Sequence, residues 1–228
     1  MSWNIAIDGP AGAGKSTIAK RAAKALGFVY VDTGAMYRGI ALGLMRMGKD
    51  AEEGEALSAA LDKIEVGLSY DNGVQQVLLN GENVSDLIRT EEVSAAASRT
   101  SAKPEVRAKL LDLQKNMAAR YNVIMDGRDI GTVILPDAQL KVFLTASVEV
   151  RAQRRYLEQQ KKGVECTLEE IREDIEKRDY QDTHREISAL RQAEDAVLLD
   201  TSDLDIDGVV AEILRLAEEK QIPAASGK

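Results

Sequence analysis

The sequence predicts an α/β fold, in which a five-stranded parallel sheet is flanked by helices and a small antiparallel insertion interrupts the order. The apolar runs at residues 5–7 and 28–31 each lead through a loop into a helix-like segment, as crossover units of a parallel sheet do. Three more apolar runs follow, at residues 121–125, 141–145 and 196–199. With 228 residues, 44% of them hydrophobic, the chain is long enough for one such domain.

Composition excludes several classes of protein. The formal net charge of −8 gives no basic field for a nucleic-acid polymer. A single cysteine, Cys166, excludes an internal disulfide framework, and a single histidine, His184, excludes a histidine metal cluster. No apolar segment has the length of a membrane span, and we expect no leader because the first residues carry no basic stretch followed by a long apolar one. We expect a cytoplasmic protein that is a monomer.

A glycine-rich loop follows the first apolar run. Residues 9–16 fit the pattern G-x-x-x-x-G-K-[ST], whose backbone N–H groups form a concave anion site. The helix predicted from Lys15 to about residue 26 directs its positive dipole end at the same site. We expect a bound triphosphate, with Lys15 as a catalytic cation and the Ser16 hydroxyl as a magnesium ligand; the alternative is a glycine-rich turn without a ligand. The expected triphosphate-binding residues are Gly9, Pro10, Ala11, Gly12, Ala13, Gly14, Lys15, Ser16 and Thr17.

The second apolar run ends at residues 32–38, where a loop passes into a helix. Ligands of open α/β sheets collect outside the carboxyl ends of the strands, which makes Asp32, Thr33 and Arg38 site candidates. The alternative for Thr33 is an ordinary helix N-cap. Helical patterns continue over residues 38–47 and 53–61.

The pattern then changes to a period of two. Residues 64–70 and 74–79 alternate as strands, and Asp71-Asn72-Gly73 between them is a hairpin signal. We expect residues 64–85 to form a small inserted sheet that closes over a substrate. Residues 91–119 are helical again, with a new helix beginning at Pro104. Arg107 lies in its first turn, where a cation opposes the helix dipole; it either faces a partner or ligand, or is solvated.

The third sheet strand ends in Asp126, followed by Gly127, Arg128 and Asp129. A carboxylate at this place holds magnesium in phosphate-loop enzymes, directly or through water. The chain ends with a helix over residues 206–220 and a tail that we expect to fray from Ile222 onward.

A long charged segment separates the fourth and fifth strands. Residues 151–191 hold ten Lys or Arg and ten Asp or Glu, and a break at Lys161-Lys162-Gly163 divides them. An ion-paired, solvated surface explains many of these charges. Phosphoryl transfer needs cations on several sides of the moving group, so we interpret the segment as a hinged lid. Arg151, Arg154 and Arg155 fall within one turn; Arg154 is assigned the catalytic role, although any of the three fits the spacing.

Four stretches together resemble the bacterial cytidylate kinase family. They are Gly9–Thr17, Asp-Thr-Gly-Ala-Met-Tyr-Arg from Asp32, Asp-Gly-Arg-Asp-Ile-Gly-Thr-Val from Asp126, and Lys-Arg-Asp from Lys177. The resemblance covers nearly the whole chain, and it implies a P-loop nucleoside-monophosphate kinase that transfers the γ-phosphoryl group of ATP to CMP or dCMP, with Mg²⁺. Many relatives have glycine then threonine after the loop lysine, whereas this chain has Ser16-Thr17; motif position favours Ser16 for the metal.

The resemblance also implies which residues bind CMP and which catalyse the transfer. It assigns the CMP site to Thr33, Arg38, Ser98, Arg107, Arg128, Asp129, Arg178, Asp182 and Arg185. The catalytic residues are Lys15, Arg128, Arg154 and Arg178, and the metal residues are Ser16 and Asp126. A carboxylate such as Asp129 accepts from the cytosine amine, and Arg107 donates to N3 or O2. Uracil offers a carbonyl at the same place and is rejected.

One kinase domain, residues 1–228, accommodates these parts. Its core is residues 1–35, 120–150 and 190–228, the monophosphate-binding insertion about 36–119, and the lid with its following helix about 151–189. The partners are ATP and CMP or dCMP, with no membrane. Two other functions stay open: a kinase of another small acceptor such as UMP or AMP, and a nucleotide-dependent switch. Against the switch, the chain has no Asn-Lys-x-Asp guanine-reading motif.

Overall fold

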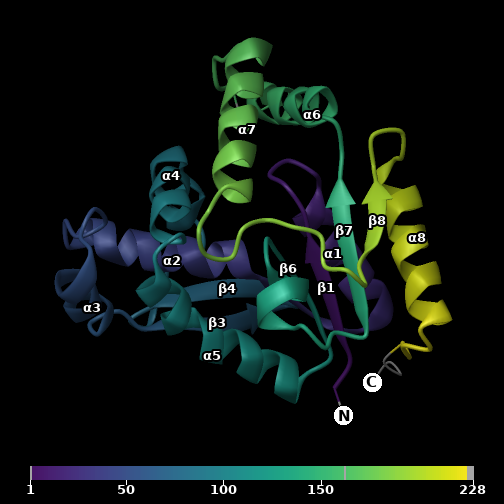
Figure 1. Ribbon diagram of the computed structural model, residues 1–228, viewed down its shortest axis with the longest axis horizontal. Coiled ribbons are helices and arrows are strands. Elements are labelled where there is room, and N and C mark those ends of the chain that lie inside the picture. The colour runs from purple at the N-terminus through teal and green to yellow at the C-terminus, as the bar shows by residue number, and fades with distance from the viewer. Residues whose placement is uncertain (1, 162, 225–228) are drawn as a thin grey trace. The chain divides into compact units, whose positions relative to one another are not determined.

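A computed structural model describes residues 2–161 and 163–224 of the chain (Figure 1). The chain divides into two compact units, Met1–Tyr30 with Tyr121–Lys228, and Val31–Arg120. A five-stranded sheet has the order β2-β6-β1-β7-β8. Its strands are β1 (Asn4–Asp8), β2 (Val29–Asp32), β6 (Val123–Gly127), β7 (Leu140–Thr145) and β8 (Val197–Asp200). β1 pairs in parallel with β6 and β7, and β7 pairs in parallel with β8, which confirms the predicted parallel sheet.

The core of the first unit forms where two helices cover this sheet. Apolar residues of α1 (Lys15–Leu26) and α8 (Ile206–Glu219) join those of β1, β6 and β7 in one buried cluster. Burial of this continuous apolar surface is the main stabilisation of the unit. Consequently the amino end of α1, which follows the phosphate loop, is fixed at the carboxyl end of the central strand β1.

The expectation of a frayed tail from Ile222 is wrong at Ile222 itself. Ile222 is buried in the same cluster as α1 and α8. After α8, Gln221 adopts a left-handed φ of 55°, and the Ile222 N–H donates to the Ala217 carbonyl at 2.9 Å. The Gln221 N–H donates to the carbonyl of Glu218, which completes the hydrogen-bond pattern of a Schellman motif. This turn folds the chain back onto the core; residues 225–228 of the expected tail lie outside the described residues.

The predicted lid consists of two helices that follow β7. They are α6 (Val148–Lys161) and α7 (Leu168–Thr183) (Figure 1). The two helices pack together through Ala152, Ile171 and Ile175. Thr167 caps α7: its hydroxyl accepts from the Glu170 N–H, and the Glu170 carboxylate accepts from the Thr167 N–H. α6 ends at Lys161 as expected, and Gly163 has a left-handed φ of 71°.

The second unit contains the predicted antiparallel insertion. A three-stranded sheet of order β3-β4-β5 is accompanied by four α-helices. The elements are α2 (Thr33–Arg46), α3 (Gly54–Leu61), β3 (Val66–Asp71), β4 (Val74–Leu79), β5 (Glu82–Asn83), the 3-10 turn η1 (Leu87–Arg89), α4 (Glu91–Thr100) and α5 (Pro104–Arg120). The short strand β5 was not expected. α2 packs closely on this sheet: a Cβ added at Gly39 would lie 3.1 Å from Cγ1 of Val77 in β4.

The start of α2 corrects one alternative for Thr33. The N-cap is Asp32, whose Oδ1 accepts from the Ala35 N–H at 2.8 Å, and α2 begins at Thr33 instead of near Arg38. The Thr33 side chain is buried. Thr33 is therefore the first helical residue and is not the cap.

Candidate active site

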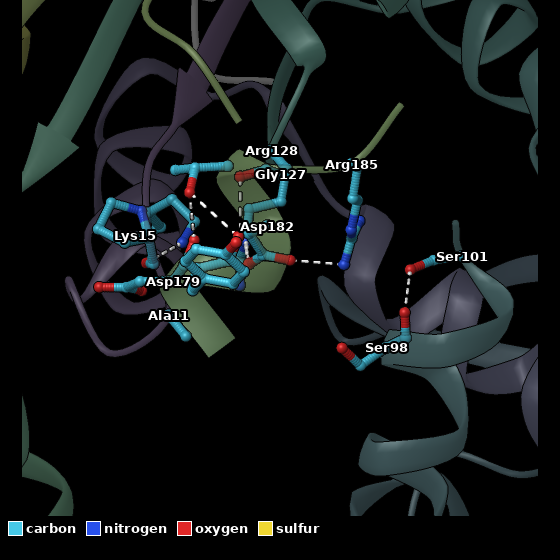
Figure 2. Close-up of polar contacts among 12 residues, drawn as sticks. Ala11, Lys15, Ser98, Ser101, Gly127, Arg128, Asp179, Asp182 and Arg185 are labelled. Carbon is cyan, nitrogen blue, oxygen red and sulfur yellow. Dashed lines mark hydrogen bonds and ion pairs between the residues drawn. The ribbon is translucent and has the colours of Figure 1, made fainter. Parts of the chain in front are cut away.

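The phosphate loop joins β1 to α1 and depends on its glycines. Gly9 has a φ of 149°, and a Cβ there would lie 1.9 Å from the Leu144 carbonyl oxygen, so no side chain fits. Gly14, the N-cap of α1, is left-handed with a φ of 89°. The Lys15 side chain is buried and its Nζ donates to the Pro10 carbonyl at 2.7 Å (Figure 2). The lysine therefore lies folded over the loop that it serves.

Burial and, after it, the charge of the nearby Arg128 together lower the pKa of Lys15 to about 7. The carboxylates of Asp126, Asp182 and Asp8 oppose this shift. A phosphate bound near Lys15 would favour the charged ammonium, so this place favours an anionic ligand.

A hydroxyl group and a carboxylate, those of Ser16 and Asp126, lie at hydrogen-bond distance beside the phosphate loop. Ser16 Oγ donates to Asp126 Oδ2 at 3.0 Å, and the Tyr30 hydroxyl donates to Asp126 Oδ1 at 2.8 Å. Asp126 itself is buried at the end of β6. A hydroxyl and a carboxylate at hydrogen-bond distance are the hard oxygen donors that magnesium prefers, so the predicted pair fits that ion.

Asp182 joins two of the predicted arginines. Its buried carboxylate accepts from Arg128 Nε at 2.7 Å through one oxygen and from Arg185 at 2.5 Å through the other (Figure 2). Burial raises the pKa of Asp182, but the guanidinium groups of Arg128 and Arg185 outweigh it and hold the pKa below its ordinary value. The carboxylate is thus ionised, and it fixes both guanidinium groups in place.

Arg178 adds a third guanidinium group to this set. It is half-buried on α7, and within the described part of the chain its side chain makes no hydrogen bond. Burial and the charge of Arg128 lower its pKa. The set Arg128, Arg178 and Arg185, with Asp182 as the carboxylate hydrogen-bonded to two of them, has the positive excess that an anionic ligand requires.

Asp129 is buried and begins a π-helical turn, η2 (Ile130–Ile134). The turn closes on its backbone, because the Asp129 carbonyl accepts from the N–H groups of Val133 and Ile134. In the first unit the structure therefore brings Arg128, Asp182 and Arg185 into direct contact, with Asp129 next to Arg128 in the chain.

The remaining four candidates belong to the second unit. Arg38 donates to Asp32 at 3.4 Å, and its buried Nε has no hydrogen-bond partner among the described residues. Arg107 is half-buried, donates to the Ser101 carbonyl at 3.1 Å and lies 5.5 Å from the centre of the Tyr37 ring, so it is not the solvated arginine of the alternative. The Ser98 carbonyl accepts from the Ser101 hydroxyl at 3.2 Å (Figure 2). Arg38 and Arg107 thus come from two helices of one unit.

Comparison with known proteins decides the family. The family model described as cytidylate kinase matches residues 5–219. The chain belongs to the cytidylate kinase family.

Similar proteins agree with this membership. A cytidylate kinase of Lactobacillus gasseri is 49% identical over 217 residues, which is 95% of this chain and 94% of that protein. A cytidylate kinase of an Exiguobacterium species is 50% identical over 218 residues, 96% of this chain and 97% of that protein. An uncharacterized protein from Eubacterium ventriosum has a similar fold, with a TM-score of 0.53 and 12% identity over 95% of this chain and 99% of that one.

The three lid arginines of this family member have different surroundings. Arg151 is buried and donates to the Ala11 carbonyl of the phosphate loop at 3.0 Å and to both oxygens of Asp179. Arg154, the predicted catalytic residue, donates to the hydroxyl and carbonyl of Thr201. Arg155 pairs with Asp174 at 2.7 Å. Arg151 therefore contacts the phosphate loop directly.

Two polar residues of the site were not identified from the sequence. Tyr30 donates to Asp126, and Asp8 at the end of β1 accepts from the turn that follows Asp129. Asp8 carried a usable signal, since it is an acidic residue that ends an apolar strand just as Asp126 does. Tyr30 carried none, because an aromatic residue in an apolar strand is typical of the core.

Proposed function

We infer that this protein transfers the γ-phosphoryl group of ATP to CMP or dCMP and forms the nucleoside diphosphate and ADP. One observation supports the inference above all: the family match over residues 5–219 includes the phosphate loop and every predicted site residue. In the reaction a phosphate oxygen of the acceptor attacks the γ-phosphorus, and the bond to the β–γ bridging oxygen of ATP breaks in line.

The residues act by positioning and charge neutralisation, without a side-chain nucleophile. Backbone N–H groups of Gly9–Thr17 and the Lys15 ammonium hold the ATP phosphates. Arg128 and Arg178 neutralise the charge of the phosphoryl group in transfer, and Arg154 is proposed as a further cation delivered by the lid. Arg154 must release Thr201 to take part.

Magnesium is the ion that we propose for the Ser16 and Asp126 pair. Bound there, it would polarise the phosphate oxygens of ATP and neutralise their charge. Among residues 2–161 and 163–224, no group of three or more His, Cys, Asp or Glu side chains is placed to hold a metal. Phosphate oxygens and water would therefore supply most of the ligands, as is usual for Mg²⁺.

CMP binding is proposed for two groups of residues. Thr33, Arg38, Ser98 and Arg107 supply one group; Arg128, Asp129, Arg178, Asp182 and Arg185 supply the other. Arg38, Arg128 and Arg185 would hold the acceptor phosphate, and Arg178 with Asp182 would face the sugar. The Asp129 carboxylate would accept from the cytosine amine, which UMP lacks. The proposal requires both groups to reach one CMP molecule.

No helix among the described residues has both the length and the apolar character needed to cross a bilayer. We propose a cytoplasmic monomer of one kinase domain, with the boundaries given under Sequence analysis.

An ADP-release assay with CMP, dCMP, UMP and AMP tests the function. We expect rapid turnover with CMP or dCMP and little with UMP. ADP release that is slow whatever acceptor is added would identify a switch instead, and a higher kcat/KM for UMP or AMP would identify another kinase. Asp129→Asn should remove the preference for CMP over UMP, because the asparagine amide can accept from the cytosine amine through Oδ1 or donate to the uracil carbonyl through Nδ2. Unchanged discrimination would contradict the account of base choice.

A further inference from the structure

A buried carboxylate supports the turn that follows the proposed base-reading residue. Asp8 is the last residue of β1, and its side chain is buried. Oδ1 accepts from the Ile130 N–H at 2.8 Å, and Oδ2 accepts from the Gly131 N–H at 2.7 Å. These are the two backbone amides directly after Asp129. Both carboxylate oxygens of Asp8 are therefore engaged with the turn.

The bonds from Asp8 restrict the backbone around Asp129. The first N–H groups of a helical turn have no partner within the turn, and Asp8 accepts from two of them in η2. On the other side, the Asp129 carbonyl accepts from Val133 and Ile134. The peptide group that follows Asp129 is thus held at both ends, at its N–H by Asp8 and at its carbonyl oxygen by Val133 and Ile134.

The turn also approaches Asp8 closely. A Cβ added at Gly131 would lie 3.3 Å from Asp8 Oδ2 and 3.1 Å from Cδ of Lys141. Contacts this tight leave the turn little room to shift as long as Asp8 accepts from both amides. A displacement of the turn would move the Asp129 side chain with it.

The chain retains this carboxylate although it is unfavourable for folding. Burial raises the pKa of Asp8 to about 6, against the opposing hydrogen bonds from Gly131 and Ile130. An ionised group in this place is destabilising, so a role in the folded state explains it better than packing does.

We propose that Asp8 is a positioning residue for base recognition, which holds the turn after Asp129 so that the Asp129 carboxylate meets the cytosine amine. The proposal rests on the proposed function. Asp8 does not touch the substrate in it; it acts through the backbone of Ile130 and Gly131. Because Asp8 also precedes Gly9, the phosphate loop and the base-reading turn share one support at the end of β1.

Asp8→Asn tests the proposal. Asparagine keeps the shape of the side chain but offers only one acceptor oxygen. Its NH2 group would face one of the two backbone N–H groups, so one of the two hydrogen bonds is lost. A displacement of about 0.5 Å would lower the ratio of kcat/KM for CMP to that for UMP about tenfold, if about 1 Å corresponds to a hundredfold. If Asp8 serves only the phosphate loop or the stability of the fold, kcat/KM falls by the same factor for both acceptors. An unchanged ratio overturns the proposal.

Asp195→Asn is the matched control. Its carboxylate accepts from Lys141 Nζ at 2.8 Å, so this variant also removes one negative charge, but it leaves both hydrogen bonds from the turn to Asp8 intact. The ratio of kcat/KM for the two acceptors should stay within about twofold of that of the wild type, below the tenfold change expected at Asp8. A tenfold fall in this control would assign the effect to charge and overturn the proposal.

Gly131→Ala tests the same contact while Asp8 and the phosphate loop stay intact. The added methyl group must displace its neighbours by a few tenths of an ångström. We expect the acceptor ratio to fall about threefold, less than for Asp8→Asn. If Asp8→Asn does not fold, as judged by circular dichroism, the Gly131→Ala variant alone tests the proposal, and an unchanged acceptor ratio overturns it.

The wild-type enzyme separates this inference from the proposed function. If the wild type has no preference for CMP, the proposed function is overturned as well. If the wild type prefers CMP and neither variant changes the ratio, only this inference is overturned.

Discussion

Removal of the Asp182 carboxylate is the perturbation whose effect the structure defines best. Asp182→Asn retains the shape but loses the charge that accepts from Arg128 and Arg185. Each charge-assisted bond contributes about 1.5–3 kcal/mol, and removal of one partner of a buried pair is destabilising by about 3–5 kcal/mol. The arginine side chains are 23% and 11% exposed, so solvent screens part of the loss. We therefore expect the unfolding free energy to fall by about 3 kcal/mol.

Urea unfolding of the ligand-free protein, followed by circular dichroism, measures this change. The folded pKa of Asp182 is below the ordinary value of 3.8, so its stabilisation is present above that pH and is lost as the pH falls further. The difference between wild type and variant should stay constant from about pH 8 to 5 and narrow below about pH 4. Asp174→Asn is the control: it lies on the same helix, its side chain is 54% exposed, and its pair with Arg155 should contribute less than about 1 kcal/mol. A loss at Asp182 no larger than at Asp174 would refute the reasoning.

Three further predictions concern single residues. Lys15→Met should lower kcat with CMP by about a hundredfold to a thousandfold while the protein stays folded, because the lost cation acts on the transferred group; turnover within tenfold of wild type would contradict this. Burial raises the pKa of Asp8 to about 6, so the folded state binds this proton more tightly than the unfolded state does. The unfolding free energy of the wild type should therefore fall by about 3 kcal/mol as the pH rises from about 4 to 6. The unfolding free energy of Asp8→Asn, measured by urea titration, should not fall over this pH range. If it falls with pH as steeply as that of the wild type, the titration of Asp8 is not the cause. His184→Ala and Cys166→Ala should retain kcat/KM within about twofold, since His184 stacks on Tyr180 at the exposed end of α7, and Cys166 packs against the cluster of Ala152, Ile171 and Ile175 and approaches the Val164 carbonyl. A large loss in a folded variant would assign one of them a chemical role.

The sequence was most informative where the signal is contiguous. The phosphate loop, the helix from Lys15 and the hairpin at Asp71-Asn72-Gly73 each follow from neighbouring residues, and the structure confirms the last two as α1 and the β3–β4 pair. The pattern failed at Ile222, a single apolar residue beyond the last helix. Periodicity cannot report a residue that returns to the core through one left-handed turn.

The sequence by itself also determined the family, because four motifs and their order identify it without any contact being known. Only the tertiary structure decided which groups are partners. Asp182 meets Arg128 across 54 positions of sequence, and Asp8 meets Ile130 across 122. Backbone preferences and turn chemistry act between near neighbours, whereas such pairings depend on how the strands are ordered in the sheet. The choice of Arg151 over Arg154 as neighbour of the phosphate loop has the same origin, since one turn of helix separates two side chains that the sequence treats alike.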